Sequence, residues 1–100
     1  MDKDNLLKLA IALWGEPAQM LMAIEEMSEL TKAICKAFRA EDMKEVTVRE
    51  RIMDEIADCK IMIRQMEIIF GDADAFEAYK LQRLEDRINA HIASHEVNHE

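Results

Sequence analysis

The sequence predicts an all-α protein, and three observations lead to that prediction. The 100 residues include only two Gly and one Pro, so few positions interrupt a helix. Ala, Leu, Met, Glu, Lys and Ile dominate the composition, and most of these residues favour helices. Apolar residues also recur every three or four positions, as on one face of a helix. A chain of this length forms one small domain.

The first half of the chain predicts two helices. A short helix runs from about Asp4 to Trp14 and ends at Gly15. Pro17 then occupies the first turn of a second helix, where proline is tolerated, and that helix continues through Arg39. The largely polar segment 40–46 is the predicted connection.

The third helix is predicted from a capping box. Thr47 and Glu50 have the spacing of that motif, which places the first helical residue at Val48. The helix extends to Phe70, with Gly71 as its stop signal.

The fourth helix begins after a cap at Asp72 or Asp74 and runs to about Ala93. Residues 1–93 are therefore predicted to form one helical domain, and residues 94–100 a frayed tail.

Charge and composition limit the partners of this chain. The net charge of -8 argues against nucleic acid, because a nucleic-acid binder normally carries a basic patch. The N-terminus lacks a signal-peptide pattern, and no uncharged stretch is long enough to span a membrane. Cys35 and Cys59, the two cysteines, fit free thiols in a reducing compartment, so a cytoplasmic location is expected.

A pair of acids interrupts the apolar face of the second helix. At about 100° per residue, Glu26 and Glu29 share a stripe with Met22, Leu30 and Ala33. An unpaired buried carboxylate costs several kcal/mol or takes up a proton, so this position is unusual for two acids.

The third helix repeats the arrangement. Glu55 and Asp58 share a stripe with Met62, Met66 and Cys59. If the two long helices pack antiparallel through these stripes, their four carboxylates converge. Oxygen ligands favour Mg²⁺, with Mn²⁺ as the other candidate, so the sequence predicts a metal site.

Ordinary surface ion pairs are the competing interpretation. Glu29 and Lys32 have the spacing of a helical ion pair. Asp58 lacks such a partner, because Ile61 and Met62 occupy the next-turn positions. The occurrence of two acid pairs, each within an apolar stripe, favours the metal site.

The acids also carry a family resemblance. Glu25-Glu26-Met27-Ser28-Glu29 and Glu55-Ile56-Ala57-Asp58 resemble the EExxE…ExxD motif of the MazG-like, all-α nucleoside triphosphate pyrophosphohydrolases. The resemblance covers residues 14–87. Dimeric dUTPases and phosphoribosyl-ATP pyrophosphohydrolases belong to the same superfamily as the MazG-like enzymes.

The resemblance implies a four-helix bundle that is completed by oligomerisation and hydrolyses an NTP or dNTP between the α and β phosphates. By that resemblance, Glu26, Glu29, Glu55 and Asp58 match metal ligands, and Glu25 matches a further catalytic acid. One of these carboxylates would act as general base. We also expect a homodimer or homotetramer, because a bundle this small buries little of its apolar surface.

Substrate contacts are expected from two other regions. Lys80 and Arg83 match the basic residues that the resembled family places on the triphosphate, and they lie on one side of the fourth helix. The alternative is a solvated stripe in which they pair with Glu77 and Asp86. Trp14 is either a stacking partner for the base or a core anchor.

Three other interpretations of the sequence compete with this one. His95 and His99 spell HExxH, but the chain offers no third zinc ligand after them. A di-iron bundle would need Glu-x-x-His pairs, which both acid pairs lack. A non-catalytic oligomeric adaptor or regulator, with Met-rich surfaces that receive a helix, is the alternative from a different functional class.

Overall fold

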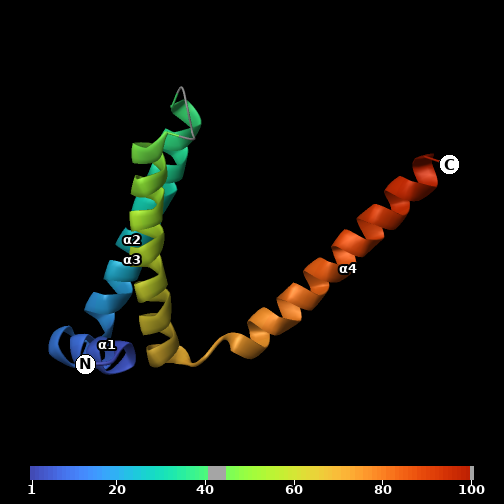
Figure 1. Ribbon diagram of the computed structural model, residues 1–100. Coiled ribbons are helices and arrows are strands. Elements are labelled where there is room, and N and C mark those ends of the chain that lie inside the picture. The colour runs from blue at the N-terminus through green and yellow to red at the C-terminus, as the bar shows by residue number, and fades with distance from the viewer. Residues whose placement is uncertain (41–44, 100) are drawn as a thin grey trace.

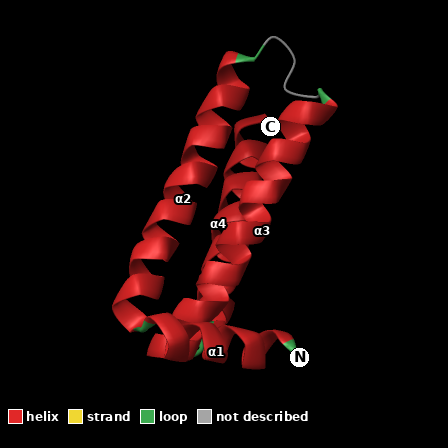
Figure 2. Cartoon of the chain, turned by 90° about the vertical axis from the view of Figure 1, so that its left-hand side faces the viewer, coloured by secondary structure: helices red, strands yellow, loops and turns green. Residues whose placement is uncertain are grey.

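The computed structural model, which describes residues 1–40 and 45–99, contains four helices and confirms the all-α prediction (Figure 1). They are α1 (Lys3–Trp14), α2 (Glu16–Arg39), α3 (Val46–Phe70) and α4 (Asp74–His99). The long helices α2 and α3 run antiparallel side by side, and α1 crosses their lower ends (Figure 2). None of these helices is long and apolar enough to cross a membrane within the residues described.

The first two helices have the predicted limits to within a residue. The Asp2 side chain accepts a hydrogen bond of 2.8 Å from the Asn5 amide and so caps α1. Gly15, at φ 90°, ends this helix, and its amide donates to the Ile11 carbonyl at 2.8 Å. Pro17 stands in the first turn of α2, as predicted.

The start of α3 differs from the prediction. The helix begins at Val46 rather than at Val48, and Glu45 occupies the cap position. Thr47 therefore lies inside the first turn, where its hydroxyl donates to the Glu45 carboxylate at 3.1 Å, and the predicted capping box is wrong. The predicted connection 40–46 falls mostly on residues 41–44, which lie outside the described part of the chain.

The junction between α3 and α4 begins with the predicted stop signal. Gly71, at φ 125°, follows the last residue of α3. The Asp72 carboxylate accepts from the Asp74 amide at 3.3 Å, and Glu67 accepts from the Ala73 amide at 2.9 Å. The helix then continues to His99, so the predicted end at Ala93 is wrong.

The buried seam lies between α2 and α3. It is made mostly of small residues, since Ala23, Ala33 and Ala37 of α2 and Cys59 of α3 are buried there together with Met62. Small side chains let the two helix backbones approach closely, which brings polar groups on the flanks of the seam near one another. The core is consequently thin.

Helix α4 projects away from this packed unit (Figure 1). Among the described residues, no Cα of α4 lies within 8 Å of a Cα in α1, α2 or α3. The radius of gyration is 18.7 Å, whereas a compact chain of this length has about 13 Å. The fourth helix thus forms an arm rather than the last member of a closed bundle within one chain.

Candidate metal centre

Three carboxylates from the two long helices gather on one side of the α2–α3 seam. Glu26 comes from α2, and Glu55 and Asp58 come from α3. One oxygen of each lies within 4.8 Å of the others, and all three residues are half-buried. We call this group the acidic triad.

The seam itself explains why these acids meet. Ala23 and Ala33 flank Glu26 in sequence on the buried face of α2, so no large side chain holds the helices apart at these levels. The Cys59 thiol donates to the backbone carbonyl of Glu26 at 3.3 Å and ties α3 to α2 at the level of the triad. Asp58 is adjacent to Cys59, which sets its position along α3.

The environment disfavours the charged forms of two triad members. Partial burial raises the pKa of Glu26, and the nearby Asp58 and Glu55 carboxylates raise it further. Partial burial likewise raises the pKa of Glu55, with added repulsion from Asp58 and Asp54 and a smaller opposing effect of Arg51. A cation between these groups would reverse both effects, because it favours the ionised carboxylates.

The donor set fits a hard divalent cation. The triad offers carboxylate oxygens from three residues, which is the chemistry that Mg²⁺ and Mn²⁺ prefer. Cys59 is no competing ligand, since burial raises the pKa of its thiol and its proton is directed at the Glu26 carbonyl. The acidic triad can therefore hold a metal ion, and its ligands do not by themselves choose between magnesium and manganese.

Glu29 and Glu25, the other predicted acids, lie outside this group. Glu29 is exposed, and its carboxylate accepts from the Lys32 ammonium at 3.3 Å, which is the ion pair weighed as the alternative. Glu25 is exposed as well. Both are near enough to raise the pKa of Glu26, so they contribute negative potential to the site.

A polar groove adjoins the triad and contains basic residues that the sequence reading missed. Its volume is about 330 Å³, and it is lined by Glu29, Lys32, Ala33, Lys36, Arg51, Asp54 and Glu55. Arg51 stands one turn before Glu55 on α3, and that i,i+4 spacing was the available signal. Cations next to an acidic cluster are suited to hold phosphate oxygens beside a metal ion.

The predicted substrate residues are not brought to the triad within one chain. Lys80 and Arg83 belong to α4, which stands apart from α2 and α3. Trp14 is 66 % exposed at the end of α1 and lines a separate shallow groove with Ala18, Gln19 and Met22. The core-anchor interpretation of Trp14 is therefore wrong within one chain, and its contact with a base stays a prediction.

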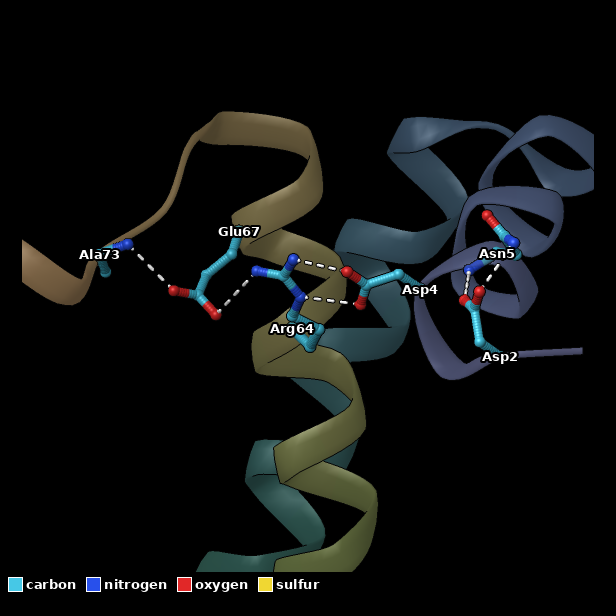
Figure 3. A network of polar contacts seen from close by, with 6 residues as sticks. All are labelled: Asp2, Asp4, Asn5, Arg64, Glu67 and Ala73. Carbon is cyan, nitrogen blue, oxygen red and sulfur yellow. Dashed lines mark hydrogen bonds and ion pairs between the residues drawn. The ribbon is translucent and has the colours of Figure 1, made fainter.

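A second acidic group lies at the α3–α4 junction. Glu67, Asp72 and Asp74 place carboxylate oxygens within 4.8 Å of one another. This group is compensated by Arg64, whose guanidinium lies 3.6 Å from Glu67 and binds both oxygens of Asp4 at 3.0 and 2.8 Å (Figure 3). With a cation and backbone amides as partners, these acids have a structural explanation.

Comparison with known proteins adds no relative. No family model, no curated protein and no solved structure matches the chain.

Proposed function

We propose that the protein is a Mg²⁺-dependent nucleoside triphosphate pyrophosphohydrolase that cleaves an NTP or dNTP between its α and β phosphates. The observation that carries the proposal is the acidic triad, three half-buried carboxylates within 4.8 Å of one another. The MazG-like motif supplies the reaction, since its positions include all three residues. The compartment proposed is the cytoplasm, where free thiols such as Cys35 and Cys59 stay reduced.

In this proposal the triad and the polar groove have separate tasks. Glu26, Glu55 and Asp58 hold the ion, which when bound supplies positive charge to phosphate oxygens and acidifies water. Glu29 and Glu25 stand close enough to extend the negative field, and Glu29 is free to exchange its Lys32 partner for a metal or a water. A carboxylate of this set takes the proton from the attacking water.

Phosphate binding is assigned first to the basic residues of the polar groove. Lys32, Lys36 and Arg51 line the same groove as Glu55 and therefore reach a triphosphate whose oxygens lie at the triad. Lys80 and Arg83 remain part of the proposal only if α4 of another chain approaches the site.

Turnover of nucleotides tests the reaction directly. The protein is incubated with a panel of NTPs and dNTPs, with Mg²⁺, with Mn²⁺ and with a chelator, and pyrophosphate release is measured. Metal-dependent pyrophosphate release is the expected result. Orthophosphate release would refute the bond chosen, and the absence of turnover on every nucleotide would refute the activity.

A stability measurement tests the metal centre independently of turnover. Because the folded protein disfavours ionised Glu26, Glu26→Gln should raise the melting temperature in chelator at neutral pH. The same substitution removes a ligand, so it should reduce the stabilisation that Mg²⁺ or Mn²⁺ gives. Glu50→Gln, an exposed acid of α3 outside the triad, is the control and should leave both quantities unchanged.

The comparison of wild type and Glu26→Gln, each with chelator and with metal, separates a metal centre from a group of acids that are merely close together. A site that binds no ion would give the rise in chelator without any effect of metal on either protein. This result, together with the absence of turnover, would favour the oligomeric adaptor. The exposed apolar surfaces of the chain are the observation that supports that alternative.

A further inference from the structure

The side of α2 next to the seam carries an exposed apolar row. It consists of Met20, Ile24, Met27, Ile34 and Phe38, with Thr31 at the remaining position. Successive members are four and three residues apart in alternation, which is the spacing of the contact positions in a coiled coil. Every member is exposed, although such rows normally face another helix.

A second row of the same spacing runs along α3. Its members are Ile52, Ile56, Cys59, Ile63, Met66 and Phe70. Cys59 is buried against α2, but Ile63 is 49 % and Phe70 is 69 % exposed. The row is therefore only partly covered by α2.

The two rows lie on the same side of the layer that α2 and α3 form. Met27 from α2 lines one apolar groove together with Ile63, Met66 and Phe70 from α3. On α2, the residues that line the polar groove lie about 120–180° around the helix from Met27. We call the surface made by the two rows the apolar face of the layer.

Helix α4 has an unpartnered apolar row of its own. Leu81, Leu84, Ile88 and Ile92 follow one another at three- and four-residue intervals, and each is about half exposed. Ala73, the residue before α4, lines both the groove of the apolar face and a groove along α4. The arm thus leaves the layer on the side of its apolar face.

The exposed area is too large for a compact monomer. The chain exposes 8175 Å², whereas a folded monomer of 11.6 kDa exposes about 5,800 Å². The difference of roughly 2,300 Å² exceeds the ~800 Å² that each partner contributes to a typical stable interface. Most of the stability of a helix in a protein comes from the packing of its apolar face, so the exposed apolar row of α4 needs a packing partner.

We propose that the apolar face of the layer packs on the same face of a second copy of this chain, and that α4 of each copy packs on the other. Two identical faces with matching coiled-coil spacing are self-complementary about a twofold axis. The arm leaves on the same side, so a second copy placed there contacts both surfaces. This inference does not depend on the proposed reaction, because it is argued from the two rows and from α4, none of which contains a residue of the acidic triad.

Three lysine substitutions and one matched control test the interface. Met27→Lys and Ile63→Lys place a charge in the centre of the apolar face, and Leu84→Lys places one in the row of α4. Ser28→Lys introduces the same residue one position from Met27, at an exposed site that points about 100° away. Molar mass is measured over a dilution series by light scattering, and helix content by circular dichroism.

The wild-type chain and Ser28→Lys should both have twice the mass of one chain. The dimer dissociation constant should rise at least about tenfold, or by about 1.4 kcal/mol, for each of the other three variants. Their helix content at a concentration where the dimer persists should match wild type, which separates lost association from lost folding.

Several results would overturn the inference. A wild-type chain that stays monomeric with a radius of gyration near 13 Å would mean that α4 folds back on its own layer. A dimer indifferent to Met27→Lys and Ile63→Lys would place the interface elsewhere. Indifference to Leu84→Lys alone would refute the contact made by α4.

Discussion

The α2–α3 layer and the arm α4 consist of helices of similar length and apolar pattern, but they differ in how much of their surface is buried. The three helices have 24, 25 and 26 residues, and each carries an apolar row. Among the described residues, α2 and α3 bury apolar residues against each other, because Ala23, Ala33 and Ala37 let α3 approach closely, whereas α4 buries none. Helix formation is thus a local property of this sequence, whereas burial depends on which surfaces the connections bring together.

The junctions of the two regions are also built differently. Gly15 leads from α1 into α2, and α1 is tied to the packed unit by the bidentate contact of Arg64 with Asp4. Gly71 leads from α3 to the arm, where Glu67 accepts from the Ala73 amide and Asp72 accepts from the amide of Asp74, the first residue of α4. Arg64 stands between the two junctions (Figure 3).

The largest expected effect concerns the buried seam. Met62 is 4 % exposed, so Met62→Ala should lower the free energy of unfolding by about 2–5 kcal/mol through lost burial and a residual cavity. Tyr79→Ala truncates a larger side chain on α4, outside its apolar row, and should change stability by less than about 0.5 kcal/mol. Urea titration measures both. Equal losses would show that α4 packs as tightly as the layer.

The glycines give a smaller contrast. Gly15 and Gly71 have φ of 90° and 125° with ψ near 155°, a region that costs other residues about 1–3 kcal/mol. Gly15→Ala should show that loss in urea titration, because α1 cannot turn without breaking its contacts with α2 and α3. In dilute, dissociated protein Gly71→Ala should lose less, since α4 has no Cα within 8 Å of the described helices α1, α2 and α3 of its own chain and can take a new direction.

Scattering separates a change in the direction of α4 from a loss of stability in the two glycine variants. The radius of gyration of Gly71→Ala should differ from that of wild type, while Gly15→Ala should keep the wild-type value. A full penalty at Gly71 in dilute protein would contradict the view that α4 can change direction once the partner copy has dissociated.

The smallest effect is expected at the tie between α1 and α3. Arg64 lowers the pKa of Asp4 below 3.8, so this contact stabilises the fold above that pH and is lost as pH falls through the lowered value. Asp4→Asn should therefore destabilise the protein at neutral pH and flatten the loss of stability on acidification.

The urea midpoint as a function of pH measures this effect. Asp86→Asn is the control from the arm, because the Asp86 carboxylate accepts from Gln82 of its own helix. A steeper acid limb for Asp4→Asn, or a parallel one, would contradict the assignment.

Much of the fold could be predicted because strong local signals mark it. Gly15, Pro17 and Gly71 act through their own backbone dihedral angles, and each stands where the sequence placed it. The start of α3 was missed because the Thr47 hydroxyl donates to the Glu45 carboxylate instead of capping the helix, which begins two residues earlier than predicted. The direction of α4 was beyond prediction, since it depends on the few residues of 71–73 and on contacts outside the chain.

The candidate site was predicted in part for a similar reason. Angular positions on a helix identified Glu26, Glu55 and Asp58 as acids near the seam, and the structure brings them together. Measured from Glu26, Glu29 has the same angular position on α2 as Asp58 has on α3 when measured from Glu55. Glu29 is nevertheless exposed and paired with Lys32. The rotation of each helix about its own axis determines which of these acids faces the seam. The spacing of residues within one helix carries no information on that rotation.

The hydrogen bond from Cys59 to the Glu26 carbonyl has a practical consequence for chemical labelling. A thiol reacts with alkylating reagents as its thiolate, and burial together with three acids raises the pKa of Cys59. Cys35 is exposed on α2. The natural sequence thus has a single reactive position for a fluorophore or spin label, placed on the helix whose apolar row we assign to the interface.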